Sequence, residues 1–298
     1  MRDRRVDTGA DVPEWFTAAL DHTPGHGRID AAGTDIAYRE WGPLETGGRS
    51  APLLLLHGVA GHSGWWDHIG PRLADRRRVV AMDLSGHGDS GRRDSYDLDG
   101  WSDEVLGLAD ALGLRRPYLV GHSLGGLIGM RVAQRAGQDL AGIVLVESVI
   151  EDRAIQVDGD PRFFRSGTSR VHRDRAVALA RWRPLPDGGD IPDFLVRHVA
   201  AGSLRKVDGG WSWKFDPRIF RCDGLHQDAI VPVRCRVALF RGETGSVTTT
   251  AQKRVASALG GRALDMTVPG AGHNIPLETP RALTLALTTL SAAWDQEL

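Results

Sequence analysis

The chain has 298 residues, of which 41% are hydrophobic and 25% are charged, the proportions of an ordinary globular protein. Its 37 basic and 38 acidic residues leave a formal net charge of -1, so no global field favours nucleic acid or an anionic membrane surface. The two cysteines, Cys222 and Cys235, are too few for a disulfide framework or, by themselves, for a structural zinc site.

The first residues, Met-Arg-Asp-Arg-Arg-Val-Asp, carry charge without a following apolar segment. No stretch of the sequence approaches the roughly 18 apolar residues that a membrane span requires. These features predict a cytoplasmic protein with no membrane partner.

The first predicted element is a short helix. It begins near Asp11, a helix-capping residue type, and we expect it to run through Leu20 with Phe16 on its apolar face. This face could cover the core or a second copy of the chain, so a homodimer is one open expectation. Residues 28–30 and 34–41 then alternate in the way of a two-stranded antiparallel ribbon.

Continuous apolar runs follow, and they alternate with helical segments. Strands that are buried on both faces produce such runs, and their alternation with helices predicts a mostly parallel sheet joined by right-handed crossovers. The runs span residues 52–56, 78–82, 117–120, 142–146, 236–240 and 263–268. The predicted fold class is therefore α/β, with helices flanking the sheet.

About ninety residues interrupt this alternation between the runs that end at Val146 and begin at Arg236. A connection this long inside a compact sheet usually has a function. We interpret it as a mostly helical cap over residues 150–210. The predicted organisation is a first core part with the amino-terminal helix, 1–149, then the cap, then a second core part, 211–298.

The sequence Gly-His-Ser-Leu-Gly-Gly at 121–126 follows an apolar run and precedes a helical stretch. In a strand-turn-helix elbow the serine sits on a sharp turn, and glycines two residues away on either side let strand and helix approach closely. Gly121 and Gly125 meet this need. Ser123 is therefore the predicted nucleophile of a hydrolase.

A serine hydroxyl needs a base within hydrogen-bond reach, and the base needs an orienting carboxylate. On this scaffold the three residues are expected in the order serine, acid, histidine. His273 lies on a glycine-rich loop after the last predicted strand and is the predicted base. We interpret four other histidines on strand-end loops as packing or loop-stabilising residues: His57, His62, His87 and His122.

Two carboxylates compete for the role of the acid. Glu147 directly follows the predicted strand 142–146, where a buried carboxylate is costly unless it has a partner. Glu243 follows the strand 236–240, in a loop where Gly245 stands near the place at which many enzymes of this architecture carry an aspartate. We expect Glu147 to be the acid, with Glu243 in reserve. The alternative that Glu147 only caps the entry to the cap stays open.

The oxyanion of acyl transfer needs backbone donors, usually one after the nucleophile and one from the loop after the third strand. Leu124 and Val59 supply these N–H groups by position. Gly58, in the turn 57–61, allows the backbone to approach the substrate. No phosphate-binding glycine motif is present in a suitable place.

The loop 83–91 contains acidic residues and a histidine. Asp83 precedes the serine and so breaks the expected order, and we predict that it holds its loop by hydrogen bonds from backbone N–H groups. No cluster of His, Cys and Asp has the spacing of a zinc site, so neither a metal nor another cofactor is expected.

Four motifs together resemble the α/β-hydrolase superfamily from about residue 28 onwards. They are His57-Gly-Val-Ala-Gly, Asp83-Leu-Ser-Gly-His-Gly-Asp-Ser, Gly121-His-Ser-Leu-Gly-Gly and Gly272-His-Asn-Ile-Pro-Leu-Glu-Thr-Pro. The resemblance implies an eight-stranded sheet with a cap inserted after strand six and a pocket between cap and core. Most members carry the acid after strand seven, so Gly245 is a departure, and members with the acid after strand six are a minority.

A carboxylate at Glu147 occurs together with three tryptophan-containing segments. These are Trp65-Trp-Asp, Arg181-Trp-Arg-Pro and Gly209-Gly-Trp-Ser-Trp-Lys-Phe-Asp-Pro, and the set resembles the bacterial hydrolases that include zearalenone-opening lactonases. Trp182 and Trp213 are the expected substrate contacts, because apolar pockets bind aromatic ligands through such rings. Packing between cap and core is the competing interpretation for both.

The leading hypothesis is a serine hydrolase of a small-molecule carboxylic ester or lactone, with a bulky aromatic lactone such as zearalenone as the specific expectation. Fold does not fix chemistry, so carbon-carbon bond hydrolysis with the same residues is a second hypothesis. A ligand-sensing protein with incidental turnover is a third.

Overall fold

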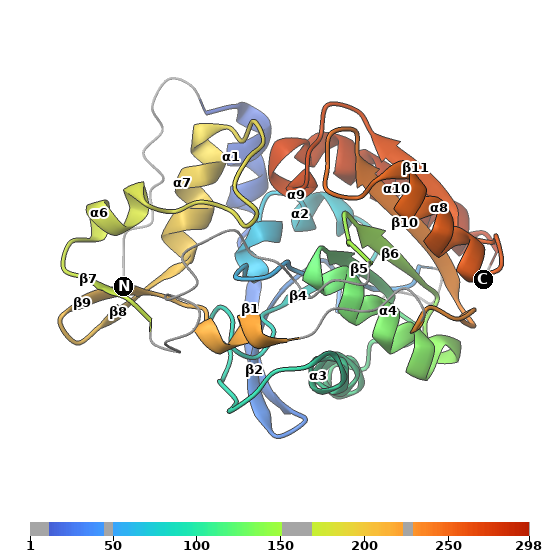
Figure 1. Ribbon diagram of the computed structural model, residues 1–298, viewed down its shortest axis with the longest axis horizontal. Helices are drawn as coiled ribbons and strands as arrows, with labels where there is room; N and C mark the ends of the chain where they lie inside the picture. Colours follow the sequence, from blue (N-terminus) through green and yellow to red (C-terminus); the bar gives the residue numbers. More distant parts are fainter. Residues whose placement is uncertain (1–11, 45–49, 151–168, 223–228, 298) are drawn as a thin grey trace.

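The computed structural model describes residues 12–44, 50–150, 169–222 and 229–297. Its main sheet has eight strands in the order β1-β2-β4-β3-β5-β6-β10-β11 (Figure 1). The hairpin β1-β2 is antiparallel and β2 runs antiparallel to β4, whereas the other neighbours are parallel. The strands are β1 (Gly25–Ala31), β2 (Thr34–Trp41), β3 (Leu53–Leu56), β4 (Val79–Met82), β5 (Tyr118–His122), β6 (Gly142–Val146), β10 (Arg236–Gly242) and β11 (Leu264–Val268). The predicted eight-stranded, mostly parallel sheet is thereby confirmed.

The central strands are buried on both faces, as the continuous apolar runs predicted. In β3, Leu54 and Leu56 enter the core on one face of the sheet, and Leu53 and Leu55 enter the core on the other face. Helices α3 (Leu98–Ala111), α4 (Leu124–Ala136) and α8 (Thr249–Ala258) cover the first face. Helices α2 (Gly70–Leu73) and α10 (Pro280–Asp295) cover the second.

One strand does not fit the expectation of burial on both faces. In β11, Leu264 is 51% exposed and Met266 is 38% exposed. The reason is position, because β11 is the last strand of the sheet and has a neighbour on one side only. The apolar run therefore predicted the strand correctly, but the prediction that both of its faces are buried was wrong.

An insertion follows β6 and returns to the sheet at β10. It contains α6 (Arg175–Ala180), α7 (Asp193–Gly202), and a three-stranded antiparallel sheet in the order β7-β9-β8. The strands are β7 (Val171–His172), β8 (Leu204–Val207) and β9 (Gly210–Trp213). Helices α6 and α7 lie within the range 150–210 that was predicted to be a mostly helical cap. The small sheet was not predicted, and β9 extends past residue 210. Residues 151–168, the beginning of the predicted cap, lie outside the described residues.

Helix α1 (Glu14–Asp21) packs on the insertion and not only on the core (Figure 1). Phe16 is fully buried, with its ring centroid 4.8 Å from that of Phe194 in α7. The predicted helix thus uses its apolar face within the chain. No helix among the described residues combines the length and the apolar character needed to cross a bilayer.

Candidate active site

Ser123 occupies the turn between β5 and α4, in the predicted elbow. Its backbone has φ 51° and ψ −115°, a left-handed conformation that costs a non-glycine residue about 1–3 kcal/mol. The surroundings leave no room for side chains beside the turn. A Cβ on Gly121 would lie 2.2 Å from the Gly125 carbonyl oxygen, and one on Gly125 would lie 2.6 Å from that of Leu56. The two glycines therefore allow the close approach that holds Ser123 in its strained geometry.

His273 lies on the loop after β11 and makes a side-chain hydrogen bond to Glu147. Its Nδ1 is 3.2 Å from Glu147 Oε2, which makes Nδ1–H the donor and leaves the lone pair on Nε2. Nε2 is buried and has no hydrogen-bond partner in the part of the chain that the structure describes. The loop stands next to the serine turn, because His122 Nε2 donates to the His273 carbonyl oxygen at 2.9 Å. The imidazole thus has the orientation of a general base.

Glu147 is completely buried directly after β6, and three N–H groups compensate for its burial. Oε1 accepts from Gly242 N at 2.7 Å, and Oε2 accepts from Ser246 N at 3.0 Å and from Val247 N at 3.3 Å. The backbone of Glu147 is itself left-handed, with φ 50°. Donors from the end of β10 and from the loop after it therefore fix the carboxylate that accepts from His273.

The reserve carboxylate points elsewhere. Glu243 is exposed, and its Oε2 accepts from Gly270 N at 2.9 Å. The space near Gly245 is taken by the other carboxylate, since a Cβ on Gly245 would lie 2.2 Å from Glu147 Oε1. Among the described residues, the structure brings Glu147 and not Glu243 to His273.

The predicted oxyanion donors lie at the same end of the sheet. Within the described ranges, neither Val59 N nor Leu124 N donates to a protein acceptor. A Cβ on Gly58 would lie 3.3 Å from Ser123 Cβ and 2.8 Å from His122 Nδ1, so the turn is in close contact with the serine. Both N–H groups are thus available to a substrate oxygen.

A buried histidine fixes the turn 57–61. His57 Nδ1–H donates to the Gly58 carbonyl at 2.7 Å, and His57 Nε2 accepts from Leu84 N at 3.2 Å. Burial lowers the pKa of His57, which favours the neutral ring that these two bonds require. This agrees with the predicted loop-stabilising role.

The histidine beside the nucleophile is neutral as well. Burial, and in second place the neighbouring His273, lower the pKa of His122 to about 3. The ring of Trp65 stacks on His122 with centroids 5.8 Å apart. His122 therefore serves as a fixed donor to the base loop and does not compete as a base near neutral pH.

His62 and Asp83 hold loops together, as the sequence predicted. Asp83 accepts from Ser63 N at 2.6 Å and from Asp89 N at 2.8 Å. His62 Nε2 lies 3.1 Å from the Val199 carbonyl oxygen in α7, which joins the core to the insertion. Groups of three or more His, Cys, Asp or Glu side chains able to hold a metal ion do not occur in the described residues.

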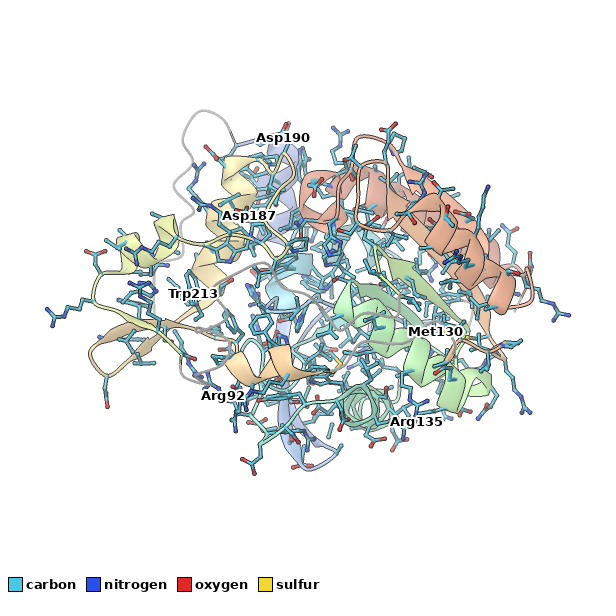
Figure 2. The ribbon with its side chains drawn as sticks, viewed as in Figure 1. Arg92, Met130, Arg135, Asp187, Asp190 and Trp213 are labelled. Carbon is cyan, nitrogen blue, oxygen red and sulfur yellow. The ribbon has the colours of Figure 1, made fainter. Side chains whose placement is uncertain are left out.

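Aromatic side chains connect the serine turn to the insertion. Trp182 is 6% exposed, its ring centroid is 6.3 Å from that of Trp65, and its Nε1–H donates to Ser203 Oγ at 3.2 Å. Trp213 is half-buried in β9 (Figure 2), with its ring 6.0 Å from that of His172. Packing accounts for most of the Trp182 surface. Trp65, which was not among the expected substrate contacts, is the tryptophan that reaches the residue before Ser123.

A cavity of about 630 Å³ lies at the opposite end of the sheet. Its lining includes Leu140 and Arg236, which stand at the amino ends of β6 and β10, and Trp294 of α10. None of the predicted site residues lines it. The carboxyl ends of the strands, where Ser123, Glu147 and the loop of His273 lie, therefore remain the candidate site, as is usual in open α/β sheets.

Comparison with known proteins identifies the family. The sequence model of the alpha/beta hydrolase family matches residues 53–286, and the chain belongs to this family. Hydrolases, including esterases and lipases, are among its relatives.

Two relatives match over most of their length. A 2-(acetamidomethylene)succinate hydrolase of Mesorhizobium japonicum is 26% identical over 95% of this chain and 98% of its own. A pimeloyl-[acyl-carrier protein] methyl ester esterase of Methylococcus capsulatus is 36% identical over 69% of this chain and 87% of its own. By contrast, the chain spans only 29% of a dihydrolipoyllysine-residue acetyltransferase component from Pseudomonas putida, at 42% identity over 35% of this chain.

Solved structures share the fold. The thioesterase domain from the curacin biosynthetic pathway superimposes with a TM-score of 0.73, covering 91% of this chain and 99% of that domain at 20% identity. At this level of identity the likeness concerns the fold alone.

Proposed function

We propose that this protein is a serine hydrolase of carboxylic esters and, within that class, a lactonase that opens bulky aromatic lactones of the zearalenone type. The observation that carries the proposal is the hydrogen bond between His273 Nδ1 and Glu147 Oε2. Among the described residues this leaves His273 Nε2 buried and without a partner, on a ring whose centroid lies 5.2 Å from that of His122, the residue before Ser123. A base oriented in this way beside a serine is the arrangement that activates a hydroxyl nucleophile.

In the proposed reaction, Ser123 Oγ attacks the carbonyl carbon while His273 Nε2 accepts the hydroxyl proton. Glu147 stabilises the resulting imidazolium, and the N–H groups of Val59 and Leu124 hold the oxyanion. The imidazolium returns the proton to the departing alkoxide, which leaves an ester of Ser123. Water, deprotonated by His273, then cleaves that ester and restores the serine. When the substrate is a lactone, the alcohol and the acid remain parts of one ring-opened product.

The finer part of the proposal concerns the aromatic substrate. Trp65 stacks on the residue before Ser123, and Trp182 meets Trp65 edge to face, so a row of largely buried aromatic rings runs from the proposed reacting centre into the insertion. Trp213 adds a half-buried ring on the insertion side, and Gly58 keeps the turn free of side-chain bulk. A ring system stacked on such surfaces would be held by contacts that aromatic groups favour.

The test measures loss of zearalenone by liquid chromatography with mass detection, with the wild-type protein and Ser123→Ala at equal concentration. We expect a product heavier by one water from wild type, and turnover about 10⁶-fold lower from the variant. Unaltered turnover by Ser123→Ala would reject the mechanism. No product with either protein would reject the lactone assignment, and a panel of p-nitrophenyl esters would then test the ester hydrolase class by itself.

A second candidate substrate follows from the relative that matches over nearly its full length. That protein is a 2-(acetamidomethylene)succinate hydrolase, and it covers 95% of this chain. The same assay with 2-(acetamidomethylene)succinate decides between the two substrates, because each gives products of different mass.

A further inference from the structure

Glu278, the last residue of α9 (Ile275–Glu278), holds both sides of the loop that carries His273. One carboxylate oxygen, Oε1, accepts from Asn274 N at 2.8 Å, and Oε2 accepts a short hydrogen bond from Gly272 N. These two N–H groups belong to the residues immediately before and after the base. A single carboxylate thus brackets His273.

The carbonyl oxygen of His273 is fixed from another direction. It accepts from His122 Nε2, in the residue that precedes the proposed nucleophile. The backbone around the base is therefore tied both to α9 and to the serine turn, while the side chain is tied to Glu147. Hydrogen bonds on several sides hold a catalytic group at a fixed position relative to the atoms it acts on. A displacement of such a group by about 1 Å can lower the reaction rate by about 10²-fold.

The same carboxylate is in contact with the insertion. A Cβ on Gly189 would lie 2.4 Å from Glu278 Oε1, so the backbone of Gly189 packs directly on the carboxylate. Asn274 is 1% exposed, and its Nδ2 donates to the Pro186 carbonyl oxygen at 3.2 Å. Asp187, which Figure 2 labels, belongs to the same loop and follows Pro186. The loop 184–190 of the insertion is therefore seated on the two residues that define the base loop.

We propose that Glu278 is a positioning residue for His273, and that through Glu278 and Asn274 the loop 184–190 couples the position of the insertion to the base. This inference rests on the proposed function, in which His273 is the base. A substrate that seats the insertion correctly would then also align the imidazole. The coupling acts on the chemical step more than on binding, because Glu278 touches the loop of the base and reaches Ser123 only through it.

The first test is Glu278→Gln, which keeps the shape of the side chain but cannot accept from both N–H groups. The readouts are kcat and KM with p-nitrophenyl acetate, and the rate at which a fluorophosphonate probe labels the serine. We expect kcat and the labelling rate to fall by about 10²-fold while KM stays within about threefold. An unchanged kcat and labelling rate in a folded variant would overturn the positioning role. A rise in KM alone would overturn it as well.

A second readout does not depend on activity. The Nδ1–H proton of a histidine that is hydrogen-bonded to a carboxylate gives a proton resonance far downfield. We expect the His273 signal in the wild type and its shift or broadening in Glu278→Gln. A wild type that no probe labels would argue against the proposed function, whereas this signal would still report whether Glu278 holds the imidazole. Failure of the proposed function can therefore be distinguished from failure of the positioning role of Glu278.

Neighbouring glycines test the link to the insertion. Gly189→Ala places a methyl group against Glu278 Oε1, whereas a Cβ on Gly188 meets nothing within 4 Å. Both glycines have positive φ, 83° and 136°, so both substitutions strain the backbone and only one presses on the carboxylate. We expect Gly189→Ala to lower the labelling rate about tenfold and Gly188→Ala to leave it within about twofold. Equal effects of the two substitutions would contradict the coupling.

Discussion

The ends of two neighbouring strands, β6 and β10, contribute different parts of the acid site: one supplies the carboxylate and the other the N–H groups that bind it. The residue directly after β6 is Glu147, which supplies the carboxylate. Gly242, the last residue of β10, and Ser246 and Val247 in the loop after it supply the N–H groups that bind this carboxylate. In the loop where the resemblance to the family implied an acid, this chain has Gly245, and the absence of a side chain at Gly245 leaves room for Glu147.

This comparison shows that the two departures from the common pattern belong together. A carboxylate arriving from β6 needs space at the end of β10, and a side chain at the end of β10 would occupy the place of that carboxylate. The left-handed backbone of Glu147, with φ 50°, is part of the same arrangement, since the strain is held by the buried hydrogen bonds of its side chain.

The largest effect is expected at the end of β6. Glu147→Gln removes the charge that orients the imidazole and presents an amide group to three N–H donors. We expect kcat to fall by about 10⁴-fold, as for the loss of charge in other acid-histidine pairs. Steady-state kinetics with p-nitrophenyl esters measure it. A loss of less than tenfold would show that the acid is elsewhere.

A smaller effect is expected from filling the space at the end of β10. Gly245→Ala puts a Cβ 2.2 Å from Glu147 Oε1, which must displace the carboxylate from His273. We expect kcat to fall about 10²-fold with little change in KM. Gly129→Ala in α4 is the matched control, because a Cβ there meets nothing within 4 Å and alanine favours a helix. Equal activity of the two variants would contradict the account of Gly245.

The smallest effect is expected at the exposed carboxylate of the β10 loop. Glu243 accepts a single N–H, from Gly270, at the surface. Glu243→Gln retains an acceptor oxygen, so kcat should stay within about twofold and the melting temperature should change little, as for most surface substitutions. If Glu243→Gln lost activity while Glu147→Gln kept it, the assignment of the two strand ends would be reversed.

The sequence predicted those elements that a short stretch of neighbouring residues defines. Six apolar runs became strands of the main sheet, and the motif around Ser123 became the turn between β5 and α4. The bonding of Glu147 to His273 was expected because an isolated carboxylate is costly at the end of a buried strand, and the structure supplies its partners.

The insertion was harder to predict for physical reasons. Strand β7 has two residues, too few to establish an alternating pattern, and β8 and β9 have four each, the shortest length at which such a pattern can be recognised. The turn between β8 and β9 contains Gly209, and β9 begins at Gly210. Both glycines have positive φ, and this pair was a local signal for a hairpin.

Glu278 was also not recognised from the sequence as a site residue. It lies five positions after His273, and its role depends on how α9 turns back onto the base loop. The spacing of five residues between His273 and Glu278 was the one feature of the sequence that could have indicated this role. The contact with Gly189 joins segments far apart in the chain, and no local pattern contains it.

The most direct test of the account is to map the site of fluorophosphonate labelling by mass spectrometry and to compare labelling rates among wild type, Glu147→Gln and Glu243→Gln. The account predicts modification of wild-type Ser123, a rate reduced about 10⁴-fold in Glu147→Gln, and a rate close to wild type in Glu243→Gln. Labelling of a different residue, or a rate in Glu147→Gln equal to that of wild type, would contradict a serine, histidine and glutamate acting together at the carboxyl ends of these strands.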